Sequence, residues 1–218
     1  MILYLLIIYL SILIYKIYNL KNYNENAILK NIDNFNIQIE GYPLYYKTEN
    51  DFNFNNFINN NIYYIIQDNN NFINLSNFND NNSKNIFINK NYKLYKDLFK
   101  EYIPKEYIQN NLINYESISI FKGETNINLR KYVNKENILY QIYGESIIYL
   151  INPKHKDNIL NKNFEEIMKW GQKIKMIPGS FLIIPPEWYS IQKSKDISII
   201  YQNEANDPFT IYYYYYNL

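Results

Sequence analysis

The segment Gly171–Ser190 reads GQKIKMIPGSFLIIPPEWYS and carries the strongest structural signal in the chain. Two short apolar runs, Ile174–Met176 and Phe181–Ile184, lie on either side of Pro178 and Gly179. Proline presets φ for a tight turn, and glycine accepts the positive φ that many turns require. We therefore predict two strands joined by a turn in this segment.

Similar short runs continue along the chain from residue 36. They are rich in Ile, Tyr and Phe and are bounded by Asn, Gly, Pro or Asp, which is typical of strands. Repeated at this spacing, they predict a sandwich or barrel. Ile138–Ile142 and Ile147–Ile151 belong to this set, and we expect them to share one antiparallel barrel or double sheet with the two strands above. The closing run Tyr212–Tyr216 predicts a terminal strand with both faces covered.

Two stretches have the spacing of helices. Lys93–Ile108 places Leu94, Leu98, Phe99 and Tyr102 on one face, and Pro104 should break it. Asn158–Lys169 predicts a second helix with a looser apolar face made of Ile159, Phe164, Ile167 and Met168.

Two motifs resemble the JmjC-type, or cupin-like, barrel of the 2-oxoglutarate oxygenases. The second half of that barrel is matched within Gly171–Ser190 by a turn, an apolar strand and a Pro-x-x-Trp-aromatic motif, carried by Pro178, Gly179, Pro185, Pro186, Trp188 and Tyr189. The first half is matched within Leu129–Pro153 by Asn137, Gln141, Gly144 and Pro153. The resemblance implies a mainly β, cupin-like double-stranded β-helix (a jelly-roll barrel) with a few helices.

The same resemblance implies that the metal site is degenerate. In the family, a His-x-Asp pair and a later His hold iron; here those positions fall on Lys131, Val133 and Ser190. A slip of one residue would give Arg130 and Tyr132 instead. The lysine that holds 2-oxoglutarate in several members falls on Ser146. No family ligand is retained, so we expect no metal, no cofactor and no catalytic residue.

The residue composition also argues against an iron site, independently of the family resemblance. A facial triad needs two histidines and a carboxylate, but the chain has one histidine, His155, and no cysteine. His155 lies in the charged stretch Asn152–Asp157, where a solvated histidine is the simpler interpretation. The net charge is +1 and Arg130 is the only arginine, so we expect no nucleic-acid partner.

The first residues, MILYLLIIYLSILIY, carry no charge and predict a membrane anchor over residues 1–18. A buried core helix or strand remains the alternative, whereas a cleaved signal peptide is disfavoured because a basic start and a small-x-small site are missing. Lys16, Lys21 and Lys30 follow the run, which predicts a single-pass protein with its body in the cytosol. We expect a linker or short helix over 19–35 and the barrel domain over 36–218.

The sequence thus favours a membrane-anchored, catalytically inactive cupin-like protein that acts as a binding or scaffold module with an unidentified protein partner. Its Asn, Ile, Tyr and Lys richness is typical of A/T-rich genomes, such as those of parasites or large DNA viruses, and would suit a virion or membrane-assembly component. A cupin-fold enzyme, hydroxylase-like or metal-independent, with an unrecognised site is the alternative. A cavity lined by Lys131, Ser146 and Ser190 would favour a ligand-binding module, and a barrel plugged by Tyr and Phe would favour a scaffold.

Overall fold

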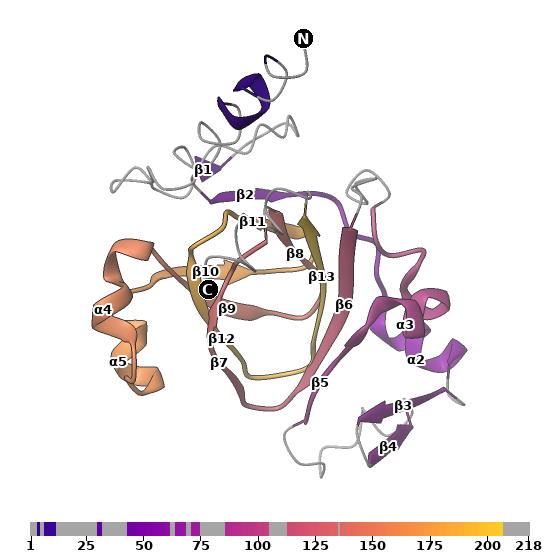
Figure 1. The fold of residues 1–218 in the computed structure, drawn as a ribbon. Coiled ribbons are helices and arrows are strands. Elements are labelled where there is room, and N and C mark those ends of the chain that lie inside the picture. The colour runs from indigo at the N-terminus through magenta and orange to yellow at the C-terminus, as the bar shows by residue number, and fades with distance from the viewer. Residues whose placement is uncertain are drawn as a thin grey trace.

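The protein is a mainly β structure built from two packed sheets. The computed structural model describes residues 4, 7–11, 30–31, 43–61, 64–68, 71–74, 86–104, 113–134 and 136–206. Figure 1 shows the strands of the two sheets facing each other around a barrel, with α2 and α3 on one side and α4 and α5 on the opposite side.

The larger sheet has seven strands in the order β1-β2-β11-β8-β13-β6-β5. All its neighbours are antiparallel except the short pair β1 and β2. Its strands are β1 (Lys30–Asn31), β2 (Leu44–Lys47), β5 (Ile86–Asn91), β6 (Ile113–Lys122), β8 (Glu136–Tyr143), β11 (Ser180–Ile184) and β13 (Ser198–Asn206).

The smaller sheet has four strands in the order β10-β9-β12-β7, all antiparallel. They are β7 (Thr125–Lys131), β9 (Ser146–Ile151), β10 (Gln172–Met176) and β12 (Tyr189–Ser194). From β6 to β13, each connection crosses to the other sheet, except that β9 leads directly to its neighbour β10. These eight strands have the order of a jelly roll. A separate hairpin pairs β3 (Ile65–Asp68) with β4 (Asn71–Asn74).

Apolar side chains alternate between the two faces of the strands and form three apolar layers. Side chains between the two sheets form the barrel interior, which includes Phe121, Tyr132, Leu182 and Trp188. The outer face of the larger sheet packs against α2 (Phe54–Asn60) and α3 (Tyr92–Phe99). The outer face of the smaller sheet packs against α4 (Lys156–Ile159) and α5 (Phe164–Met168), which follow a short 3-10 turn, η3 (Pro153–His155).

An aromatic ladder crosses the larger sheet on its outer face. Phe181 lies opposite Tyr46 on one side and Tyr140 on the other, and its ring stacks on both, with centroid distances of 4.8 and 4.3 Å. Cross-strand aromatic pairs of this kind stabilise a sheet and fix its register.

The strands predicted within Gly171–Ser190 are confirmed as β10 and β11, and those upstream as β8 and β9. The predicted turn between β10 and β11 is also present. Gly179 has φ +84°, and a Cβ there would lie 2.2 Å from the Thr48 carbonyl oxygen. The turn therefore requires glycine both for its conformation and for the close approach of the backbone.

The helix predicted over Asn158–Lys169 is wrong as a single element. The structure has α4 and α5 instead, because Asn161 adopts φ +60° and Asn163 starts a new helix with a capping box to Glu166. The apolar residues assigned to its face do pack on the smaller sheet. In the upstream stretch α3 ends at Phe99, five residues before Pro104.

Most of the predicted anchor and the closing tyrosine run lie outside the described residues. Residues 7–11 are helical, with exposed side chains at Ile7, Ile8, Tyr9 and Leu10. In the described parts of the chain, no helix is both long and apolar enough to cross a membrane. Of the predicted linker, Lys30 and Asn31 form strand β1 rather than a helix.

Candidate functional site

The positions that the resemblance to JmjC-type barrels assigns to a metal site lie where β7 ends beside β12. Arg130 of β7 is the cross-strand partner of Ser190 in β12. Tyr132 follows β7 and lies in the barrel interior, with its Oη 3.0 Å from Ser190 Oγ. The Arg130 guanidinium carbon lies 5.2 Å from the centre of the Tyr132 ring. Arg130, Tyr132 and Ser190 are therefore neighbours at one end of the barrel.

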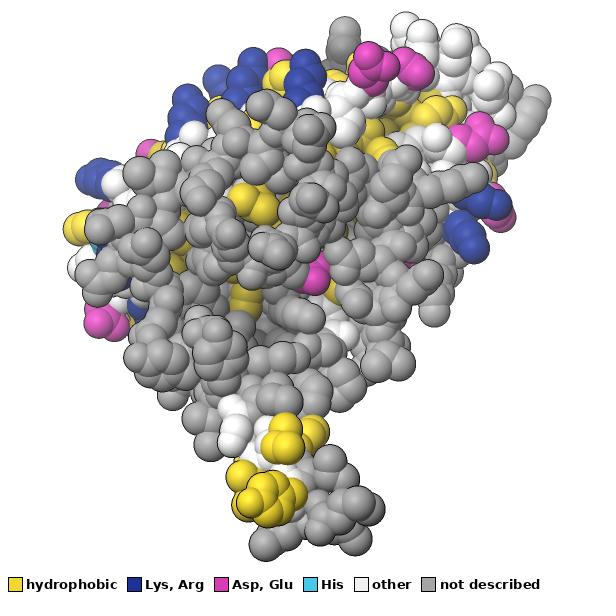
Figure 2. All heavy atoms as spheres, turned by 90° about the horizontal axis from the view of Figure 1, so that it is seen from above, with side chains coloured by type: hydrophobic (Ala, Val, Ile, Leu, Met, Phe, Trp, Pro, Cys, Tyr) yellow, Lys and Arg dark blue, Asp and Glu magenta, His cyan; other side chains and the backbone are white. Residues whose placement is uncertain are grey.

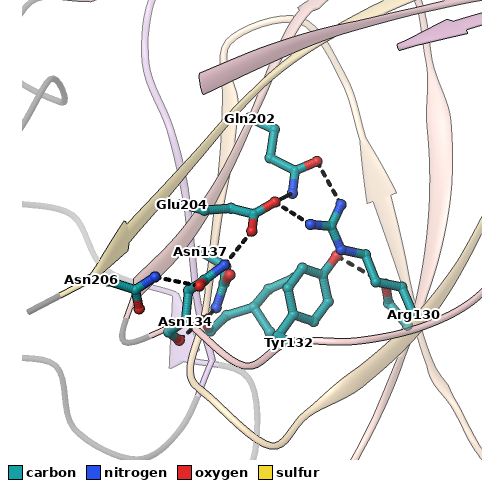
Figure 3. A network of polar contacts seen from close by, with 9 residues as sticks. Arg130, Tyr132, Asn134, Asn137, Gln202, Glu204 and Asn206 are labelled. Carbon is teal, nitrogen blue, oxygen red and sulfur yellow. Dashed lines mark hydrogen bonds and ion pairs between the residues drawn. The ribbon is translucent and has the colours of Figure 1, made fainter. Parts of the chain in front are cut away.

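Polar side chains of β13 complete this cluster (Figure 3). Arg130 donates hydrogen bonds to Gln202 Oε1, at 3.0 Å, and to Glu204, with which it forms an ion pair. Gln202 Nε2 also donates to Glu204, at 2.6 Å, and Asn134 donates to the other carboxylate oxygen. The Glu204 side chain is 12% exposed and that of Arg130 is 38% exposed. We call Arg130, Asn134, Gln202 and Glu204 the ion-pair network.

The electrostatics of the cluster oppose a bound cation. The Glu204 carboxylate, its one acid, already accepts hydrogen bonds from three side chains. Burial raises the pKa of the Tyr132 phenol, and Arg130 together with the Ser190 hydrogen bond lowers it only in part. Tyr132 is therefore a neutral phenol at physiological pH and provides no anionic oxygen.

The predicted metal-site residues are not all brought together. Ser190 lies in the cluster, but Lys131 is the cross-strand partner of Tyr189 and its Nζ lies 2.8 Å from Glu187 Oε2. Side chains alternate between the faces of a strand, so the register that starts at Lys131 points away from Ser190. Of the two registers, the one with Arg130 and Tyr132 lies beside Ser190. Val133 is partly exposed and belongs to the same outward register as Lys131.

Ser146, the predicted cosubstrate position, lies at the opposite end of the barrel. It is the cross-strand partner of Ser194, four residues along β12 from Ser190, a distance of roughly 13 Å along a strand. Its Oγ donates to Gln141 Oε1 at 2.8 Å, and Gln141 Nε2 donates to Ser198 Oγ at 2.7 Å. Ser146 therefore helps to satisfy a buried glutamine.

The other motif residues hold the barrel together. The buried Asn137 donates to the carbonyls of Asn134 and Ile184, at 3.0 and 3.1 Å, and thereby fixes the chain beside the cluster. Trp188 is 2% exposed and lies in the barrel interior, and its carbonyl accepts a hydrogen bond from Tyr132 N at 2.9 Å. Pro186 is also buried, in the turn just before Trp188. Gly144 makes a turn with φ +67°.

An iron centre does not fit these residues. Arg130 is a cation, the buried phenol of Tyr132 keeps its proton, and the Ser190 hydroxyl is a weak neutral donor. Within the described ranges, no three His, Cys, Asp or Glu residues come together as metal ligands would. His155 lies outside the barrel, where its ring packs 5.1 Å from that of Trp170. Partial burial and the neighbouring Lys154 lower the pKa of His155.

Sequence reasoning missed the contribution of β13. Its polar residues Gln202, Glu204 and Asn206 recur at every second position, so they share one face of the strand. The apolar residues that mark this strand end at Tyr201, three residues before Glu204. Glu204 follows the apolar part of the strand and lies on the same face as Gln202. A carboxylate at such a position could have indicated a buried polar contact, because acids are seldom buried without a partner.

No family model matches the sequence. No curated protein matches it either. Among solved structures, a cupin superfamily protein from Desulfitobacterium hafniense is similar at 13% identity and a TM-score of 0.37, covering 57% of this chain and 82% of that chain. A conserved protein of unknown function from Streptococcus pyogenes has 4% identity and a TM-score of 0.35, covering 56% and 75%. The coconut allergen cocosin has 8% identity and a TM-score of 0.37, covering 59% and 28%.

The fold is similar to that of cupins. Its eight barrel strands have the order of the jelly roll, the architecture to which cupins belong. The barrel end beside β7 and β12 is the part of this fold that carries the cluster around Arg130.

Proposed function

We propose that this chain is a non-catalytic, cupin-like scaffold module of the JmjC type, in which a structural ion pair has replaced the metal centre. The observation that supports this is the contact between Arg130 and Glu204 beside Ser190. A guanidinium and a carboxylate that satisfy each other leave neither a cation site nor a free base. The network therefore fits a structural role better than a catalytic one.

The assignment to the JmjC type is supported by the positions of three residues relative to the family's metal ligands. Arg130 and Tyr132 have the spacing of the family's His-x-Asp pair, and Ser190 follows the Pro-x-x-Trp motif where the second His stands. In the structure these three positions are neighbours, as ligands of one metal would be. The barrel interior beside them is filled by Tyr132 and Trp188, which are 3% and 2% exposed. A filled interior favours the scaffold over a module that uses this end as a pocket.

We expect purified protein to contain iron only at background level and to show no decarboxylation of 2-oxoglutarate. Iron in this geometry needs two imidazoles and a carboxylate and must keep open positions for the cosubstrate and oxygen. Metal analysis by mass spectrometry and a decarboxylation assay, run beside an active 2-oxoglutarate oxygenase, measure both quantities.

Stoichiometric iron together with turnover would contradict the proposed function. The variants Ser190→Ala and Arg130→Ala would then locate the site. Turnover lost in both would place a working centre at the end of β7, whereas turnover retained in both would place it elsewhere in the chain.

We further propose that the N-terminal segment holds the module at a membrane with the body in the cytosol. Support comes from the uncharged run Met1–Tyr15, the lysines that follow it and the exposed apolar side chains within residues 7–11. We expect the full-length protein to stay in the membrane pellet after carbonate extraction. In sealed vesicles whose cytosolic face points outward, we expect protease added from outside to digest the body of the protein. Release by carbonate would contradict the anchor, and protection of the body would contradict the orientation.

A further inference from the structure

A groove of about 660 Å³ lies at the end of the barrel opposite the ion-pair network. Three turns meet there: the one between β6 and β7, the one between β8 and β9, and the one between β12 and β13. The end of β10 contributes Lys175. The groove shares no residue with the cluster around Arg130, so it is independent of the proposed function.

Lysine side chains dominate the charge of the groove. Lys193 in β12 and Lys175 in β10 are both cross-strand partners of Ile147 in β9. The three residues form one row on one face of the sheet, and the two lysine Cα atoms lie roughly 10 Å apart because neighbouring strands are about 4.8 Å apart. Lys195 adds a third cation from the turn between β12 and β13. Figure 2 shows Lys and Arg side chains gathered along one edge of the molecule, at the upper left.

Two acids neutralise only part of this charge. Glu145 Oε1 lies 2.8 Å from Lys175 Nζ, and both side chains are 58% exposed. Asp196 is the second acid in the lining. Three accessible lysines, Lys175, Lys193 and Lys195, against two acids leave a net positive groove. An exposed pair such as Glu145 with Lys175 adds little to stability and exchanges easily for another partner.

The walls of the groove are held in a fixed arrangement. Gly144 has φ +67°, and a Cβ there would lie 1.9 Å from the Ile197 carbonyl oxygen, so two of the turns are in direct contact. Ser194 Oγ donates to the carbonyls of Asp196, at 3.0 Å, and Glu145, at 3.4 Å, and thereby links the same two turns. A preformed site loses less entropy when it binds a ligand.

We propose that this groove binds a small ligand that carries phosphate groups. Its volume falls within the range of ligand pockets, about 300–1,000 Å³. Lysine ammonium groups are common phosphate partners because they act as compact point charges. Ile147, between Lys175 and Lys193, offers an apolar surface to the rest of the ligand. Charges that come from β10, from β12 and from the turn after β12 suit a ligand with more than one phosphate.

Isothermal titration of the full-length protein with inorganic pyrophosphate at low ionic strength tests this site. We expect saturable binding that weakens as salt is added, because exposed charges are screened. Lys193→Gln and Lys175→Gln should each weaken binding about tenfold, the loss expected for one hydrogen bond to a charged group. Lys162→Gln is the matched control, because Lys162 is exposed and lies outside the groove.

Two sources of phosphate are distinguished with vesicles of phosphatidylcholine, alone or with added phosphatidylinositol bisphosphate. Extra retention on the bisphosphate vesicles that is lost in Lys193→Gln would identify a lipid headgroup, and retention that this change leaves unaltered would identify a soluble ligand. No binding of pyrophosphate, or an equal loss of binding in Lys162→Gln, would overturn the proposal.

Discussion

Replacing Trp188 by alanine is expected to lower the free energy of unfolding by about 3–5 kcal/mol, the usual cost of truncating a buried aromatic side chain. Trp188 is 2% exposed and packs in the barrel interior with Leu182, Ile184 and Tyr132. The smaller side chain would leave a cavity that two hydrogen-bonded sheets cannot close. Urea denaturation followed by circular dichroism measures the change as a lower midpoint with an unchanged slope.

Trp170→Ala is the matched control for this measurement. Trp170 is 43% exposed, lies after α5 and packs on His155 outside the barrel. Its removal should change stability far less, because little buried surface is lost. A small effect of Trp188→Ala, comparable to that of Trp170→Ala, would mean that the barrel interior is not filled as the structure describes.

The sequence predicted the structure best where the local conformation and the tertiary contacts require the same residue. Pro178 and Gly179 lie between two apolar runs, and the turn needs glycine for its positive φ and for its contact with Thr48. The strands on either side enter different sheets, yet each was predicted from its own short apolar run. Strand identity is a local property of this kind, so β8 to β11 could be predicted without knowing their partners.

The predicted helix over Asn158–Lys169 shows what apolar spacing alone does not predict. Its apolar spacing is correct, but Asn161 takes a left-handed conformation and Asn163 caps a new helix. Asparagine is common throughout this chain, so its capping signal could not be separated from the composition. Periodicity thus predicted which side chains pack on the sheet, but not the break between them.

The register of β7 decides which of its side chains lie beside Ser190. One residue of slip exchanges the faces of a strand, and this separates the register of Lys131 and Val133 from that of Arg130 and Tyr132. Ser190 was singled out from the Pro-x-x-Trp motif, and in the structure it pairs with Arg130 of β7. Glu204 could not be assigned to the site from sequence, because its pairing with Arg130 depends on the position of β13 between β6 and β8.

Replacing Glu204 by alanine is expected to lower the free energy of unfolding by about 2–3 kcal/mol, below the cost of breaking a fully buried ion pair. The change leaves Arg130, Asn134 and Gln202 without the acceptor that they share. Partners left unsatisfied in this way account for most of the loss. Arg130 is 38% exposed, so water can partly replace the carboxylate and limits the effect.

A double-mutant cycle with Arg130→Ala separates the ion pair from the rest of the network. Arg130→Ala and Glu204→Ala should be non-additive by about 1–2 kcal/mol, because each removes the same contact. Glu145→Ala is the control, since Glu145 forms an exposed ion pair with Lys175, and it should leave the urea midpoint almost unchanged. Additive effects of Arg130→Ala and Glu204→Ala would show that the pair contributes nothing as a pair. The proposal that a structural ion pair took the place of a metal centre would then lose its physical basis.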